Sequence, residues 1–116
     1  MRQTRNVLDH DGTELVIVPL GSTALEATLE KEDYEFLLKL GASPNFAISA
    51  KQYVTVGIGG GREYVARLIM KARAEQRIRY KDGNTLNLRK SNLQLNDQSR
   101  NFAALLNHFN ILGDRA

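Results

Sequence analysis

The apolar residues of this chain occur in short runs, and turns rich in glycine and asparagine separate each run from the next. Runs of strand-like composition lie at residues 14–20, 23–29, 46–49, 52–58 and 77–80. No run approaches the roughly 20 residues that a membrane-spanning helix requires. The chain has 116 residues, which is enough for one hydrophobic core but not for a second. The pattern therefore predicts a single domain over residues 1–116.

Three other segments have helical character. Residues 31–40 carry acidic side chains in their first turn, where the helix dipole favours them, and Thr28 is the expected N-cap. Apolar residues at helical spacing predict a second helix at 64–74 and a C-terminal helix at 97–112. Residues 1–13 are expected to form a flexible tail. The predicted class is α+β, with small antiparallel hairpins, an N-terminal helix and a C-terminal helix.

Composition excludes several kinds of chemistry. The chain has no cysteine, so it has no disulfide scaffold, no thiol nucleophile and no zinc–thiolate site. Its two histidines, His10 and His108, leave few places for imidazole catalysis. The N-terminus lacks the apolar stretch of a signal peptide, which predicts a cytoplasmic protein. No sequence feature indicates a membrane or a small-molecule substrate as the partner.

Positive charge is concentrated in one part of the chain. The formal net charge is +3, but residues 62–100 hold ten Lys or Arg against four acids, a local charge of +6. The remaining residues carry −3. Such a segregated basic segment is typical of a surface that faces phosphates. A solvated helix face is the alternative interpretation of the same charges.

Residues 64–93 carry a pattern that is more specific than charge. The runs DGNTL at 82–86 and RKSNL at 89–93 follow the segment YVARLIM that begins at Tyr64. Together they resemble the HNH endonucleases of phages and homing elements, which belong to the His-Me finger (ββα-metal) nucleases. The likeness extends upstream to LEKEDYEFL at 29–37 and QYVTV at 52–56. The resemblance implies a ββα-like motif region at 62–95 that precedes the C-terminal helix.

The residues that perform catalysis in that family are largely replaced. The family's Asp-His pair supplies a metal ligand and the general base that activates water, and these positions are Arg79 and Tyr80 here. A further family histidine corresponds to Ala66, and only the metal-binding asparagine is retained, as Asn92. Tyrosine is a poor base at neutral pH, and an arginine repels the cation that an aspartate would attract. The sequence therefore predicts no catalytic residue, no metal and no cofactor.

The resemblance then implies a catalytically inactive relative that binds duplex DNA, as a regulator or as an accessory protein of a phage or mobile element. Arg79 and Tyr80 are expected to contact a phosphate that a metal would bridge in an active relative. The predicted DNA-binding residues are Arg62, Arg67, Lys71, Arg73, Arg77, Arg79, Tyr80, Lys81, Asn84, Arg89, Lys90 and Arg100. A homodimer is expected if the protein recognises a defined site. The apolar face of the C-terminal helix is a candidate dimer surface, and packing within the domain is the default interpretation of that face.

Two other functions fit the same sequence. A divergent active nuclease would use Mg²⁺ or Mn²⁺ with His108, with Asp82 or with a residue of a partner. A protein-interaction module would use the basic segment to meet an acidic protein. Several residues also have simpler structural roles. Asn84 and Asn87 suit turns, Asn92 is expected to hold the turn backbone, and Tyr34, Phe36, Tyr53 and Phe102 are expected in the core.

Overall fold

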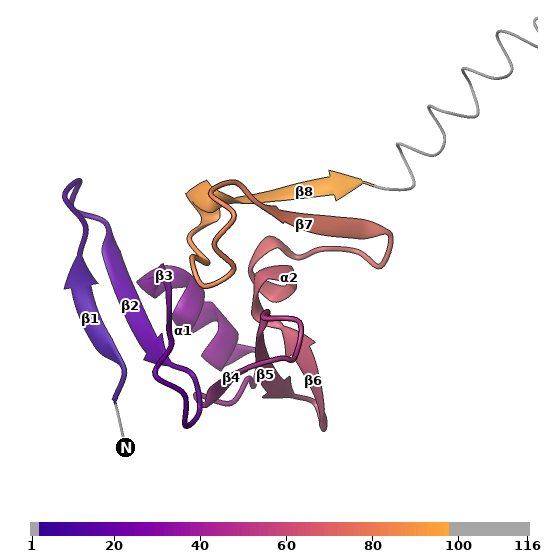
Figure 1. Ribbon diagram of the computed structural model, residues 1–116, viewed down its shortest axis with the longest axis horizontal. Coiled ribbons are helices and arrows are strands. Elements are labelled where there is room, and N and C mark those ends of the chain that lie inside the picture. The colour runs from indigo at the N-terminus through magenta and orange to yellow at the C-terminus, as the bar shows by residue number, and fades with distance from the viewer. Residues whose placement is uncertain (1–2, 98–116) are drawn as a thin grey trace, which may run out of the picture.

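The computed structural model describes residues 3–97, which form three small antiparallel sheets and two α-helices. Figure 1 shows the first sheet on one side of the molecule, the second sheet beside it and the third across the top, with both helices between them. The predicted α+β class is therefore confirmed. No helix in the described range is long and apolar enough to cross a membrane.

The three sheets follow one another along the chain. The first contains β1 (Arg5–Leu8), β2 (Glu14–Pro19) and β3 (Glu26–Glu30), and the second contains β4 (Phe46–Ile48), β5 (Val54–Ile58) and β6 (Gly61–Tyr64). The third is a two-stranded ribbon of β7 (Gln76–Tyr80) and β8 (Leu93–Asp97). Helix α1 (Lys31–Lys39) follows β3, helix α2 (Val65–Met70) follows β6, and a 3-10 turn η1 (Lys90–Asn92) precedes β8. A parallel bridge between Leu20 and Phe46 joins the first two sheets.

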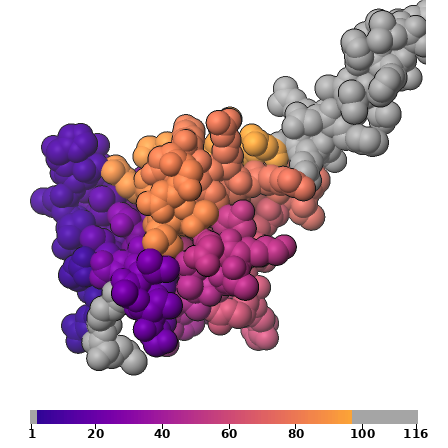
Figure 2. All heavy atoms as spheres, viewed as in Figure 1, coloured from indigo at the N-terminus to yellow at the C-terminus, as the bar shows by residue number. Residues whose placement is uncertain are grey.

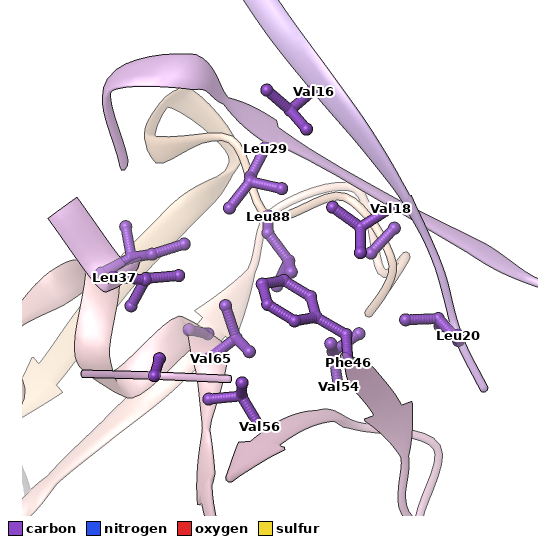
Figure 3. Close-up of a cluster of buried hydrophobic side chains, with 14 of the residues drawn as sticks. Val16, Val18, Leu20, Leu29, Leu37, Phe46, Val54, Val56, Val65 and Leu88 are labelled. Atoms are coloured by element: carbon purple, nitrogen blue, oxygen red, sulfur yellow. The ribbon is translucent and has the colours of Figure 1, made fainter. Parts of the chain in front are cut away.

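One hydrophobic core lies between the sheets and the helices. Alternate residues of the strands enter it, as the pleat of a half-buried strand dictates. Figure 3 shows side chains from β2, β3, β4 and β5 meeting Leu37 of α1 and Val65 of α2. Phe46 is the largest side chain of the cluster and is almost completely buried. Burial of this apolar surface is the main stabilising contribution to the fold.

The segment between β7 and β8, residues 81–92, contributes to the same core and is called the β7–β8 loop below. Leu88 in this loop is fully buried, and Figure 3 shows it among the side chains of the first two sheets. Backbone hydrogen bonds fix its position, because the Thr28 N–H donates to Leu86 O at 2.9 Å and the Leu88 N–H donates to Thr28 O at 2.7 Å. In Figure 2 the orange loop lies against both the indigo and the magenta parts of the chain.

Helix α1 and the strong β-segments were predicted correctly, but three local predictions were wrong. The expected tail at 1–13 contains strand β1, which pairs with β2 and is held by an Arg5–Glu26 ion pair of 2.6 Å. Thr28 is not the N-cap of α1, because its backbone pairs with the β7–β8 loop and Glu30 occupies the cap. The helix predicted at 64–74 ends at Met70, since Lys71 adopts a left-handed conformation with φ 53°.

The predicted ββα-like arrangement at 62–95 is not confirmed: this region contains α2, then β7, η1 and the first residues of β8, which pairs with β7. The helix predicted at 97–112, with the apolar face expected to form a dimer, lies outside the described residues.

Candidate nucleic-acid interface

The β7–β8 ribbon has one polar face and one apolar face. Antiparallel register places Arg77 opposite Asn96 and Arg79 opposite Gln94, so these four side chains share one face. Both arginines and Gln94 are exposed, and Lys81, which follows β7, is exposed as well. These five residues are called the ribbon face below. Its side chains are cations and amides, the groups that donate hydrogen bonds to phosphates and to base edges.

The opposite face of the ribbon packs against the other elements of the domain. Ile78, Tyr80, Leu93 and Leu95 lie on it, and Leu93 is nearly fully buried. Tyr80 is half-buried, and its ring stacks on the ring of Tyr53 with centroids 6.0 Å apart. Burial disfavours the charged phenolate, so the pKa of Tyr80 rises to about 12. The phenol is therefore a weaker acid than a free tyrosine and keeps its proton at neutral pH, where almost no phenolate is present to act as a base.

Because its pKa is raised, Tyr80 should lose its proton at a higher pH than a free tyrosine does. We expect the Tyr80→Phe variant to lack an ionisation near pH 12 that the parent protein shows in an ultraviolet absorbance titration. The unfolded phenol ionises near its ordinary pKa of 10.0, so the folded state holds this proton more tightly. Stability should accordingly fall as the pH rises from about 10 to about 12. Identical titrations of the two proteins would contradict the buried position of the ring.

Asn92 supports the β7–β8 loop from within, as expected. It is 7% exposed, its amide group donates to Asn87 O at 2.9 Å, and its carbonyl oxygen accepts from the Asp82 N–H at 2.9 Å. Asp82 is part of the same brace, since one carboxylate oxygen accepts from the Asn84 N–H and the other from the Asn87 side chain. The hydrogen bond from Asn87 and that from the Asn84 backbone lower the pKa of Asp82. Asn84 and Asn87 therefore have the expected turn chemistry.

Two predicted DNA-binding cations form ion pairs that anchor the β7–β8 loop. Arg89 pairs with Asp9 at 2.6 Å, and both side chains are largely buried. Lys90 pairs at 3.1 Å with Asp33 of α1, whose side chain is only 4% exposed. Burial raises the pKa of Asp33, although the Lys90 ammonium opposes this effect. The structure thus gives Arg89 and Lys90 a structural role, because each neutralises a buried or half-buried carboxylate, while the Lys90 side chain is still 48% exposed.

Four further predicted cations lie outside the ribbon face and have intramolecular contacts. Arg62 donates to Thr55 Oγ1 at 3.0 Å, and Arg67 donates to the carbonyls of Gln76 and Arg73. The Lys71 ammonium lies 5.1 Å from the centre of the Phe36 ring, and Arg73 pairs with Glu75 at 3.0 Å. These contacts bind the neighbouring elements together. Arg100, His108 and Phe102 lie outside the described residues.

A cleft of about 440 Å³ lies beside the ribbon, on its apolar side. Three tyrosines line it, namely Tyr53, Tyr64 and Tyr80, and the Tyr53 and Tyr64 ring centroids are 5.6 Å apart. Tyr53 was expected in the core but is only half-buried at this cleft. Three cations, Lys51, Arg67 and Arg77, also line the cleft, as does Ala66.

Sequence reasoning did not identify Gln94, Asn96, Lys51 or Tyr64 as site residues. The alternation of polar and apolar residues in β8 was the available signal for Gln94 and Asn96. Nothing in the sequence placed Lys51 and Tyr64 together, because the approach of β5, β6 and β7 is a tertiary contact. Within residues 3–97, no three His, Asp or Glu side chains gather into a group that could hold a metal ion.

The chain matches no protein-family model, no curated protein and no solved structure.

Proposed function

We propose that this protein binds duplex DNA through the ribbon face and does not cleave it. The observation that carries the proposal is the register of β7 and β8, which brings Arg77 and Arg79 opposite two amides on an exposed surface. The described side chains on this face include no carboxylate. A two-stranded ribbon is narrow enough to enter the major groove of B-DNA, where arginine and amide side chains recognise base edges. The resemblance to HNH nucleases supports a nucleic-acid partner independently.

Phosphate contacts should supply most of the affinity. Arg77, Arg79 and Lys81 lie close together in the middle of the chain's basic segment, and each can neutralise one phosphate. Release of condensed counterions then makes the binding constant fall with salt, with a log–log slope of about −0.9 for each phosphate. Three contacts predict a slope of about −2.7. Amides and shape would add a smaller, sequence-dependent contribution.

The Arg79→Gln variant tests this proposal. We expect duplex binding to weaken and the magnitude of the salt slope to fall by about 0.9, because one phosphate contact is lost. Fluorescence anisotropy of a labelled duplex, measured at several salt concentrations, gives both quantities. Lys39→Gln is the matched control, since it removes the same charge from the end of α1, outside the ribbon face. Equal slopes for the parent protein and Arg79→Gln would contradict the proposed interface.

The absence of cleavage is proposed from the chemistry of three positions. Arg79 stands where the resemblance places a metal-binding aspartate, and Tyr80 stands where it places the general base. The Tyr80 phenol has a pKa of about 12, and Asn92 is buried in the loop brace. DNA binding should therefore be unchanged by a chelator, and plasmid DNA should stay intact with Mg²⁺ or Mn²⁺. Nicking that a chelator abolishes would instead establish a divergent nuclease.

A regulatory or mobile-element accessory role is the biological context that we propose for such a protein. Homodimerisation would extend the contact area beyond one small ribbon and would suit a two-fold DNA site.

A further inference from the structure

We propose that the cleft lined by Tyr53, Tyr64 and Tyr80 binds an unpaired nucleobase of the DNA whose backbone lies on the ribbon face. The proposal rests on the proposed function and adds to it a preference for DNA that contains an unpaired nucleotide. The cleft volume of about 440 Å³ falls within the roughly 300–1,000 Å³ that small-molecule sites occupy.

The composition of the cleft indicates an aromatic anion as its ligand. Aromatic rings form one part of its wall, with Tyr53 at the centre, stacked on Tyr80 and in edge contact with Tyr64. Ala66 and Ile78 add apolar surface. Tyrosine rings stack on every base, because each base has a π face, and this contact is tolerant of sequence.

The charges of the cleft complement a phosphate. Lys51 is exposed in the middle of the loop between β4 and β5, and the Arg67 guanidinium is held in place by hydrogen bonds to the carbonyls of Gln76 and Arg73. Arg77 belongs both to the cleft and to the ribbon face. Among the residues that line the cleft there is no carboxylate to attract a cationic ligand. A nucleotide combines the ring and the negative charge that these groups would recognise.

Tyr64 is the tyrosine best placed to receive a base. It is 37% exposed, more than the two other rings, and it lies at the point where β6 leads into α2. The Tyr64 backbone is held by pairing with Thr55, so a change of side chain leaves this pairing intact. Tyr64→Leu removes the aromatic face but keeps apolar volume, whereas Tyr64→Phe keeps the ring.

The continuity of the cleft with the ribbon face explains how one DNA molecule would occupy both. Arg77 lines the cleft and also belongs to the ribbon face, so the two surfaces meet at this residue of β7. A strand that follows the arginines therefore needs to displace only one base to reach the tyrosines. Extrusion of a base from an intact duplex is costly, but an unpaired base has no pairing to lose.

Three labelled hairpin duplexes test the proposal by fluorescence anisotropy. The first is fully paired, the second has one unpaired adenine nucleotide, and the third has an abasic nucleotide at the same place. We expect the parent protein to bind the second about tenfold more tightly than the other two, as a single base–aromatic stack predicts. Tyr64→Leu should lose this preference and keep its affinity for the paired duplex, and Tyr64→Phe should retain both.

Each other outcome overturns a specific claim. Equal affinity for the paired and unpaired probes, or a preference that persists in Tyr64→Leu, overturns the cleft proposal and leaves the ribbon face in place. Equal affinity for the abasic and adenine probes also overturns it, because the base would then contribute nothing. If no duplex binds, the proposed function fails, and a labelled single-stranded oligothymidylate tests the cleft alone.

A second variant tests the cleft independently, in case Tyr64→Leu does not fold. Lys51→Gln removes an exposed cation from the cleft without changing a packed side chain. It should weaken binding of the unpaired probe and of the single strand by severalfold, whereas the charge-matched Lys39→Gln should not. If neither the duplexes nor the oligothymidylate binds, both proposals are wrong.

Discussion

Replacing Leu88 with alanine should destabilise the protein by about 2–5 kcal/mol, the range for deletion of a fully buried leucine side chain. The side chain is fully buried although it belongs to an irregular loop, and it packs among residues from the first two sheets. The backbone of Leu88 is bonded to Thr28, so the loop has little freedom to collapse into the space that the substitution leaves. Urea denaturation should show a lower midpoint with an unchanged m-value.

The control for this substitution is Leu8→Ala. Leu8 is 69% exposed on β1, and we expect a change of at most about 0.5 kcal/mol there. A midpoint for Leu88→Ala that equals that of Leu8→Ala would show that the β7–β8 loop does not contribute to the core.

Lys90→Met should destabilise the protein in a pH-dependent way. The substitution leaves the Asp33 carboxylate in its buried position without its ion-pair partner, and Asp33 Oδ2 already has no hydrogen-bond partner among the described residues. An unpaired buried acceptor costs about 1–3 kcal/mol, and partial exposure of the lysine favours the lower part of that range.

The sign of the pH dependence follows from the pKa of Asp33, which burial raises above its ordinary value of 3.8 and which Lys90 holds down. Without Lys90 the pKa of Asp33 rises further, so the folded state retains the proton more strongly than the unfolded state. Stability then falls as the pH rises from the unfolded pKa to the new folded pKa. The variant should be close to the parent protein below pH 3.8 and clearly weaker at neutral pH.

Urea midpoints of Lys90→Met at acidic and neutral pH test this expectation. Lys81→Met is the matched control, because Lys81 lies at the start of the same loop and is exposed. Adding Asp33→Asn to Lys90→Met should recover much of the lost stability, since the buried charge is then removed. A loss in Lys90→Met that is independent of pH would contradict the role of the ion pair.

The sequence predicted those elements whose signal is local. The acidic first turn of α1 and the β-branched residues around Val54–Ile58 specify their elements through short-range preferences. The role of Asn92 also followed from local turn chemistry. The early end of α2 did not, because a lysine at φ 53° carries no signature comparable to glycine.

The site was harder to predict than the fold, because its residues are selected by contacts between distant segments. In the sequence, Arg89 and Lys90 cannot be distinguished from the other cations of the basic segment. Their structural role is visible only in the folded protein, where they form ion pairs with Asp9 and Asp33. The pairing of β7 with β8 also revealed two site residues that the sequence had not indicated, because its register places Gln94 and Asn96 on the ribbon face. Charge counting therefore did not distinguish the cations that hold the fold together from those of the ribbon face, and it missed the amides beside the latter.

The burial of Leu88 also constrains when the protein can fold during its synthesis. The core made by the first two sheets lacks this side chain, and that of Leu93, until the ribosome has released the β7–β8 loop and β8. Contacts between segments this far apart in the chain form late and slow the folding of a small domain. A nascent chain that stops before the loop would expose part of its core to other chains and to proteases. Folding of this domain should therefore be completed only after translation has passed β8.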